Sequence, residues 1–135
     1  MFDTKIAIVI RDDLAMWQKL NVTAFLTSGL VAQSPEIIGE PYRDADGHVY
    51  NPMTIQPMVV LSADQETLRG MHRRSVERQV TISAYTEEMF GTGHDAANRA
   101  VFAQFSPDIA KLAGLALRAE RRIVDKIVKG ARMHQ

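Results

Sequence analysis

Four short runs of apolar and β-branched residues occur along the chain, and they predict the strands of a sheet. The first, residues 5–10, reads Lys-Ile-Ala-Ile-Val-Ile and is apolar without alternation. A strand of this kind is covered on both faces and lies in the middle of an α/β sheet. The other predicted strands are residues 57–61, residues 80–85, which alternate on one face, and residues 111–118.

Helical spacing of apolar residues between these runs predicts four helices. The residues expected to form the buried face of the first helix, residues 14–31, are Trp17, Leu20, Ala24 and Phe25, with Val22 and Leu26 widening that face. A capping box of Ser62 and Gln65 begins the second helix, which runs to about Arg78. The other two cover residues 94–105 and 119–129, and Gly130 ends the last one.

Turn-forming residues separate the first helix from the second strand. Residues 37–50 predict a hairpin with an Asp-Gly turn, and prolines at positions 41, 52 and 57 keep it at the edge of a sheet. Strands alternate with helices, and no repeat or linker interrupts them. We therefore expect a single α/β domain over residues 1–135, with a mixed four-stranded sheet, helices on both faces and an edge hairpin.

The composition limits the classes of function. Hydrophobic residues make up 46% of the chain and charged residues 24%, as in soluble globular domains. Sixteen basic residues balance sixteen acidic ones, so bulk attraction to nucleic acid or to an anionic membrane is not expected. No apolar run has the length of a membrane span, and the N-terminus lacks the pattern of a signal peptide, which predicts a cytoplasmic protein without membrane contact.

Sequence motifs for metals and cofactors are absent. The chain contains no cysteine, which excludes disulfides, thiolate catalysis and cysteine-ligated metals. The four histidines do not have the spacing of a metal site, and the glycines form neither a dinucleotide fingerprint nor a phosphate loop. We therefore predict no metal and no cofactor.

Charge is unevenly distributed along the chain. Residues 111–135 carry seven basic and two acidic residues, and the second helix adds four arginines at positions 69, 73, 74 and 78. Two interpretations remain open. These faces could bind phosphate groups, or they could be the solvated outer faces that surface helices normally have, and we favour the second.

Two segments resemble the type II peptidyl-tRNA hydrolases. Near the N-terminus, Arg11, Asp13, Leu14 and Met16 follow the pattern Arg-x-Asp-Leu-x-Met after a strand, and Lys19 aligns with that family's lysine if one residue is skipped. Near the C-terminus, Gly114, the pair Asp125-Lys126 and the segment from Gly130 resemble its last strand and helix. A third, softer match is Glu88 with Thr92, four residues apart, where the family has Asp and Thr. The resemblance implies a three-layer sandwich.

The departures from that family fall on its catalytic helix. Thr23 stands where the family has glutamine, Leu26 where it has histidine, and a glycine is missing. In this respect the chain resembles an uncharacterised bacterial family, the domain of unknown function numbered two thousand. Activity does not follow from such a likeness of fold.

Four residues are the candidates for catalysis and five for substrate binding. The catalytic candidates are Lys19, Glu88, Thr92 and His94; the substrate-binding candidates are Asp13, Thr23, Asp95, Asn98 and Lys111. In a hydrolase, Glu88 would orient a water molecule, Thr92 would donate to the developing oxyanion and Lys19 would supply positive charge. The alternatives are structural: Asp13 as the cap of the first helix, Thr92 or Asp95 as the cap of the third, and Lys19 and Glu88 as solvated side chains.

These observations leave two hypotheses of function. In the first, which we favour, the protein has lost the catalytic helix residues and binds an unknown small ligand or partner. In the second, it hydrolyses an ester or amide bond in peptidyl-tRNA or a related tRNA-like conjugate. The resemblance also implies a homodimer, which the apolar first helix and the hairpin permit.

Overall fold

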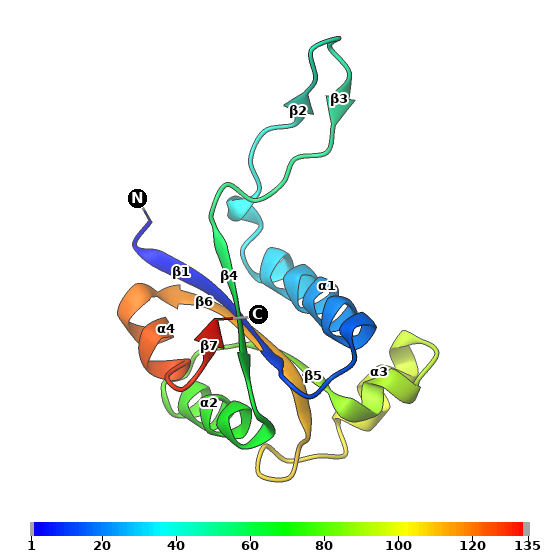
Figure 1. Ribbon diagram of the computed structural model, residues 1–135, viewed down its shortest axis with the longest axis vertical. Coiled ribbons are helices and arrows are strands. Elements are labelled where there is room, and N and C mark those ends of the chain that lie inside the picture. Colours follow the sequence, from blue (N-terminus) through cyan, green and yellow to red (C-terminus); the bar gives the residue numbers. More distant parts are fainter. Residues whose placement is uncertain (1, 134–135) are drawn as a thin grey trace.

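The centre of the molecule is a twisted five-stranded sheet with the strand order β5-β6-β1-β4-β7 (Figure 1). We describe it from a computed structural model that covers residues 2–133; Met1, His134 and Gln135 lie outside the described residues. The strands are β1 (Thr4–Arg11), β4 (Met58–Ala63), β5 (Ser83–Thr86), β6 (Leu112–Glu120) and β7 (Arg132–Met133). Strands β1 and β4 are parallel, and the other neighbours are antiparallel, so the sheet is mixed as predicted.

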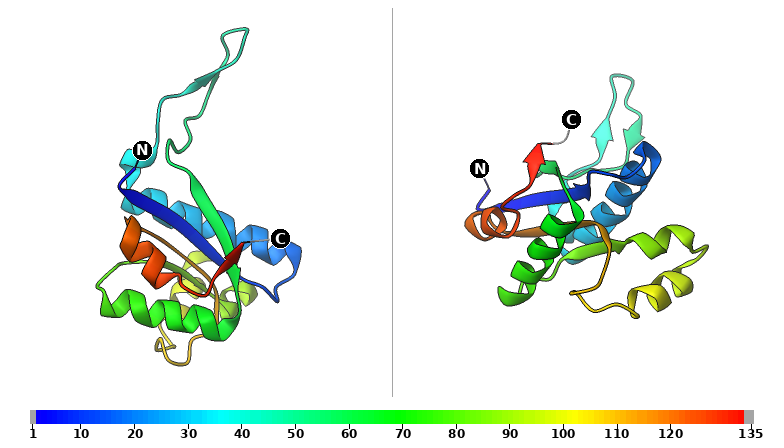
Figure 2. Two further views of the ribbon diagram at one scale, coloured as in Figure 1. Left: turned by 60° about the vertical axis from the view of Figure 1, so that its left-hand side comes forward. Right: turned by 60° about the horizontal axis from the view of Figure 1, so that its bottom comes forward.

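Helices cover both faces of this sheet, which gives three layers (Figure 2). Helix α1 (Met16–Gln33) packs on one face, while α2 (Gln65–Glu77) and α4 (Arg121–Ile127) pack on the other. The first strand contributes to both layers because its side chains alternate. Ile6, Ile8 and Ile10 join the core under α1, whereas Ala7 and Val9 join the core under α2 and α4.

The predicted elements correspond to observed ones with four corrections. The sheet has a fifth strand, β7, which pairs with only two residues of β4, Leu61 and Ser62. As a result β4 is half-buried rather than enclosed. The cap of α2 is also different, because Asp64 rather than Ser62 accepts the hydrogen bond from the backbone nitrogen of Thr67 (2.8 Å).

The predicted buried face of α1 is the third correction. Val22, Leu26 and Leu30 are buried, whereas Trp17, Leu20 and Phe25 are 61%, 65% and 50% exposed. Because apolar residues occur on every side of this helix, their spacing predicts a helix but does not show which stripe meets the sheet.

The hairpin is not part of the five-stranded sheet, which is the fourth correction. After a 3-10 turn, η1 (Pro35–Ile37), strands β2 (Tyr42–Arg43) and β3 (Val49–Tyr50) form a separate two-stranded sheet that projects from the body (Figure 1). The expected Asp-Gly turn is present, with Gly47 at φ +85°, but the expected position at a sheet edge is wrong. Asp44 holds the turn by accepting a hydrogen bond from the hydroxyl of Tyr50 (2.7 Å), which lowers the pKa of Asp44.

None of the helices within residues 2–133 combines the length and apolar character that a membrane crossing requires.

Candidate functional site

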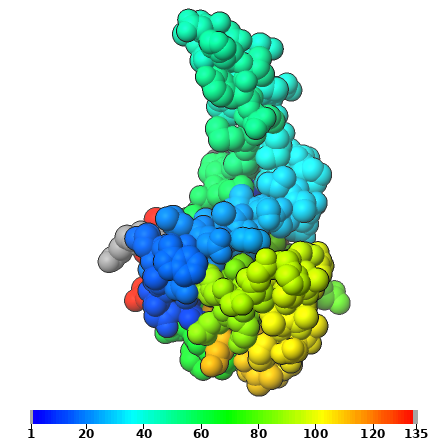
Figure 3. Space-filling view, turned by 90° about the vertical axis from the view of Figure 1, so that its right-hand side faces the viewer, coloured from blue at the N-terminus to red at the C-terminus, as the bar shows by residue number. Residues whose placement is uncertain are grey.

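A cleft of about 360 Å³ lies between α1 and the segment that follows β5. Helix α1 contributes Trp17, Asn21 and Phe25, which are four residues apart and therefore share one flank of the helix. The opposite wall comes from the 3-10 turn η2 (Glu87–Gly91) and from helix α3 (Asp95–Phe102). Figure 3 looks onto this side of the molecule, where the blue half of α1 lies beside the yellow-green segment that carries η2 and α3.

Four aromatic rings in edge-on or tilted contact form the apolar part of the cleft. The ring of Trp17 lies 5.7 Å from that of Phe90, Phe90 lies 5.1 Å from Tyr85, and Tyr85 lies 5.6 Å from Phe25, measured between centroids. These separations are within the range in which aromatic pairs attract one another beyond the burial of their area. The rings therefore support each other and form a continuous apolar wall.

Two hydrogen-bonded pairs place polar atoms along this wall. Nδ2 of Asn21 donates to the hydroxyl oxygen of Tyr85 (3.3 Å), and burial raises the pKa of Tyr85. On the other side, the hydroxyl of Thr92 donates to the carbonyl oxygen of Met89 (2.9 Å) and pairs with Oδ1 of Asn98. An asparagine amide can make four hydrogen bonds, so both asparagines retain capacity for a ligand.

His94 is the cap of α3. Its Nδ1 accepts a hydrogen bond from the backbone nitrogen of Ala97 (3.2 Å), a role that the sequence suggested for Thr92 or Asp95. An accepting Nδ1 carries no proton, so the proton of the neutral ring is on Nε2, which is available as a donor. Asp95 instead accepts from Nε of Arg99 (2.7 Å), one turn further along α3.

Four of the nine candidates therefore lie together, and Lys19 and Thr23 lie elsewhere. Thr92, His94, Asp95 and Asn98 line the cleft. At 100° per residue, Lys19 lies about 160° and Thr23 about 120° around α1 from Trp17, so both are turned away from the flank that lines the cleft. The hydroxyl of Thr23 donates to the carbonyl oxygen of Lys19 (2.7 Å), which is an interaction internal to the helix.

Asp13 and Lys111 both lie near Arg11, where β1 ends. The buried guanidinium of Arg11 donates to Oδ1 of Asp13 (2.6 Å), to Oε2 of Glu87 (3.2 Å) and to the carbonyl oxygen of Leu112 (3.3 Å). Asp13 is therefore not the cap of α1; Ala15 takes that position. The carbonyl oxygen of Lys111 accepts from the backbone nitrogen of Glu87 (2.8 Å).

Glu88 also lies outside the residues that line the cleft. Its Oε2 is buried and has no hydrogen-bond partner among the residues that the structure describes. Together with the position of Lys19, this separates the predicted catalytic residues into different parts of the fold.

The cleft residues that sequence reasoning missed are Asn21, Tyr85 and Phe90. The apolar spacing predicts Trp17 and Phe25 as core residues and Tyr85 as part of an ordinary strand. A usable signal was present, because Asn21 interrupts an otherwise aromatic stripe at positions 17, 21 and 25. A polar residue between two aromatic ones on a helix flank favours a lined cleft over a packed core.

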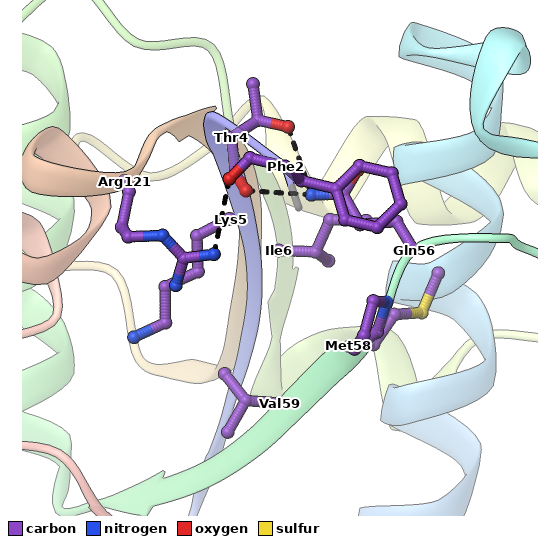
Figure 4. Close-up of a pocket in the computed structure, with 9 residues that line it drawn as sticks. Phe2, Thr4, Lys5, Ile6, Gln56, Met58, Val59 and Arg121 are labelled. Carbon is purple, nitrogen blue, oxygen red and sulfur yellow. Dashed lines mark hydrogen bonds between the residues drawn. The ribbon is translucent and has the colours of Figure 1, made fainter.

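A larger groove of about 680 Å³ lies at the other end of the sheet, where β1 and β4 begin (Figure 4). Its central polar residue is already bonded: Nε2 of Gln56 donates to the carbonyl oxygen and to the hydroxyl of Thr4 (3.0 Å each). Nζ of Lys5 pairs with Asp125 (2.7 Å). Because these groups are engaged with one another, we place the candidate site in the aromatic cleft.

Several of the arginines in the basic segments stabilise the fold. Nε and a terminal nitrogen of Arg74 donate to the carbonyl oxygen of Ile127 (3.0 and 2.7 Å), at the end of α4. Arg118 donates to Gln56 and to Ser34. Within residues 2–133 there is no group of three or more histidine, cysteine, aspartate or glutamate residues that could hold a metal ion.

Comparison with solved structures reveals a close relative. The structure of Atu0240, a protein of unknown function from Agrobacterium tumefaciens strain C58, is 70% identical in sequence and superposes with a TM-score of 0.99. The match covers 100% of both chains. The comparison with curated proteins returns no match.

A family model covers almost the whole sequence. It is described as "Protein of unknown function (DUF2000)" and matches residues 4–135. The expected membership of that family is thereby confirmed, whereas neither match involves a peptidyl-tRNA hydrolase, so that resemblance stays a prediction. The chain belongs to the DUF2000 family.

Proposed function

We propose that this protein binds a small, flat, uncharged molecule in the aromatic cleft. The observation that carries the proposal is the wall of four rings, which is flanked by the amides of Asn21 and Asn98. Ligand sites combine apolar or aromatic walls with a few well-placed polar groups, and their volumes begin at about 300 Å³. A cleft of about 360 Å³ therefore suits a single ring system with a small substituent.

The charges around the cleft favour a neutral ligand. No lysine or arginine is among the described residues that line it, and its one carboxylate, Asp95, is paired with Arg99. Amide, hydroxyl and imidazole groups recognise the hydrogen-bonding edge of a heterocycle, while the rings stack against its faces. An uncharged nucleobase or nucleoside has both features, so we take it as the ligand class.

Trp17 provides the readout for a direct test. It is the only tryptophan in the chain and lines the cleft while 61% exposed, so its emission reports on occupancy. We expect adenosine or another neutral nucleoside to change this emission saturably, and ribose alone to leave it unchanged. Loss of one neutral hydrogen bond costs about 0.5–1.5 kcal/mol, so Asn98→Ala should weaken binding about 2- to 13-fold.

The matched control is Asn51→Ala, which removes an exposed asparagine from the hairpin. It should bind as the wild type does. If no neutral purine or pyrimidine nucleoside changes the emission, the ligand class is wrong; if Asn51→Ala weakens binding as much as Asn98→Ala, the location is wrong.

Hydrolysis of a tRNA conjugate is the second candidate, and one observation favours it. The buried Oε2 of Glu88 has no hydrogen-bond partner among the described residues. This carboxylate oxygen is therefore free to accept a hydrogen bond from a water molecule. Against it, Lys19 lies on the other flank of α1, and Nδ1 of His94 already accepts a hydrogen bond. We expect purified protein to release no more peptide from peptidyl-tRNA at low salt than Glu88→Gln and Lys19→Ala do. Turnover that both variants abolish would replace the binding proposal.

A further inference from the structure

The aromatic cleft continues into a second hollow of about 390 Å³, which lies between α1 and α3. The residues that line both spaces are Phe25, Met89, Asp95 and Asn98. Because the two hollows share these four residues, they are neighbouring parts of one depression rather than separate sites. A ligand that fills the first hollow therefore reaches the second without crossing open solvent.

Helix α3 presents one face to both hollows. Asp95, Asn98 and Phe102 follow one another at intervals of three and four residues, so they lie on one stripe of the helix. Asp95 and Asn98 line both spaces, whereas Phe102, the last residue of α3, lines only the second. Along this stripe the lining changes from hydrogen-bonding groups to an aromatic ring.

The second hollow has largely apolar walls. Phe25 on α1 and Phe102 on α3 are 50% and 43% exposed, and Ala103 continues the wall beyond Phe102. The sulfur of Met89 accepts a hydrogen bond from the backbone nitrogen of Thr86 (3.3 Å), which restrains this otherwise flexible side chain. The fold of the chain thus leaves two phenyl rings exposed around one space.

The charged groups at this hollow are paired with each other. Nε of Arg99 donates to the carboxylate of Asp95 (2.7 Å), and both side chains are mostly exposed. An arginine of this kind keeps its charged end in water while its methylene stem covers apolar surface. Among the described residues that line the hollow, the ones that remain for an occupant are mainly apolar.

The packing of α3 is incomplete without such an occupant. None of its eight described residues is buried. Helices this short owe their stability to the packing of an apolar face rather than to their own hydrogen bonds. An apolar group held between Phe25 and Phe102 would complete the packing of α3 against α1.

We propose that the ligand is a nucleobase or nucleoside that bears an apolar substituent, and that this substituent occupies the second hollow against Phe25 and Phe102. This inference rests on the proposed function, which places the base in the first hollow. Small-molecule sites begin at about 300 Å³, so a space of about 390 Å³ suits one ring or a short branched chain.

Two benzylated adenosines test this directly against adenosine. The first carries a benzyl group on the exocyclic amine, and the second carries a benzylamino group on the imidazole ring, so they present the phenyl ring from opposite edges of the purine. The emission of Trp17 reports the binding of all three. We expect at least one of the two to bind about tenfold or more tighter than adenosine. A tenfold gain corresponds to about 1.4 kcal/mol, which burial of about 55 Å² of apolar surface supplies.

Phe102→Ala separates the second hollow from the first. It removes one of the two exposed rings, so the gain from the benzyl group should fall below about threefold. Adenosine should bind this variant as it binds the wild type, because Phe102 does not line the first hollow. The matched control is Phe2→Ala, which removes a phenyl ring from the groove at the other end of the sheet and should keep the full gain.

The possible results distinguish this inference from the proposed function. Saturable binding of adenosine without a gain from either benzylated compound overturns the inference alone. A gain that Phe102→Ala retains in full does the same, and so does tighter binding of adenosine monophosphate than of both benzylated compounds, because Arg99 would then serve a phosphate group. If none of the compounds changes the emission, the inference and the proposed ligand class are both wrong.

Discussion

At the scale of single residues, Asp64 offers a test of how α2 begins. Its carboxylate accepts from the backbone nitrogen of Thr67 (2.8 Å), and this hydrogen bond lowers its pKa from the ordinary 3.8. The folded protein therefore keeps Asp64 ionised at a lower pH than the unfolded chain does. The stabilisation is complete above the unfolded value and is lost as the pH falls through the folded one.

We therefore expect Asp64→Ala to lower the melting temperature at neutral pH, and this difference to shrink as the pH falls below 3.8 towards about pH 2. Ser62→Ala removes the cap that the sequence suggested and should have a smaller effect, as should Asp46→Ala, which removes an exposed aspartate from the hairpin turn. Thermal unfolding followed by circular dichroism at both pH values measures all three. A difference for Asp64→Ala that persists in acid would contradict the capping role.

The sequence identifies functional candidates well in a loop that concentrates polar groups. It does so less well in a helix, where the side that faces the site is not known. The segment between Gly91 and Asn98 drew attention through its glycines and histidine, and the structure places it along the cleft. The capping residue within it was not predictable, since Thr92, His94 and Asp95 can all accept from a backbone nitrogen. Lys19 is a candidate only through the resemblance to a family, and such a resemblance does not show on which side of α1 a residue lies.

At the scale of elements, α1 packs closely on the sheet at Gly114. A Cβ atom added at Gly114 in β6 would lie 2.9 Å from Cγ1 of Val22 and 2.9 Å from the carbonyl oxygen of Val9. Neither neighbour can move away, because Val22 is fully buried and Val9 belongs to the central strand. The absence of a side chain at position 114 thus sets how near α1 approaches.

We expect Gly114→Ala to reduce the free energy of unfolding by about 1–3 kcal/mol, the usual cost of an overpacked core. Gly91→Ala is the control, because a Cβ there would meet no atom within 4 Å; it should change stability by less than about 0.5 kcal/mol. Urea denaturation of both variants gives the comparison. Equal stability of Gly114→Ala and the wild type would mean that α1 packs further from β6.

Helices and strands with a strong pattern of apolar residues were predicted well. The neighbouring elements with which they pair were predicted less well. The apolar run of β1 and the spacing in α1 and α4 correspond to observed elements. The strand β7 was missed because two residues carry no periodicity. The hairpin was correctly predicted as a turn with flanking strands, but which neighbour those strands pair with depends on contacts that no local pattern encodes.

At the scale of the whole molecule, the hairpin and the body are joined by few interactions. Near its base, the backbone nitrogen of Gly39 donates to the carbonyl oxygen of Met53 (3.0 Å), and that of Ile55 donates to Ile37 (2.8 Å). A bridge between Ile38 and Thr54 completes the junction. Beyond it, the exposed apolar side chains of the hairpin gain no burial from the body, so the fold of a single copy does not explain why they are apolar.

Replacing residues 41–51 with a short glycine-serine turn tests whether the body of the protein needs the hairpin. The base of the hairpin is retained, and changing loop length costs only about 0.6 kcal/mol per doubling, so the body should unfold at nearly the same temperature as the wild type. Nucleoside binding in the aromatic cleft should also be unchanged, because none of the described residues that line it belongs to the hairpin. Thermal unfolding and the emission of Trp17 give the two readouts. If the body melts far lower, the hairpin supports the fold of the body; if binding is lost while the melting temperature is unchanged, the hairpin contributes to the site.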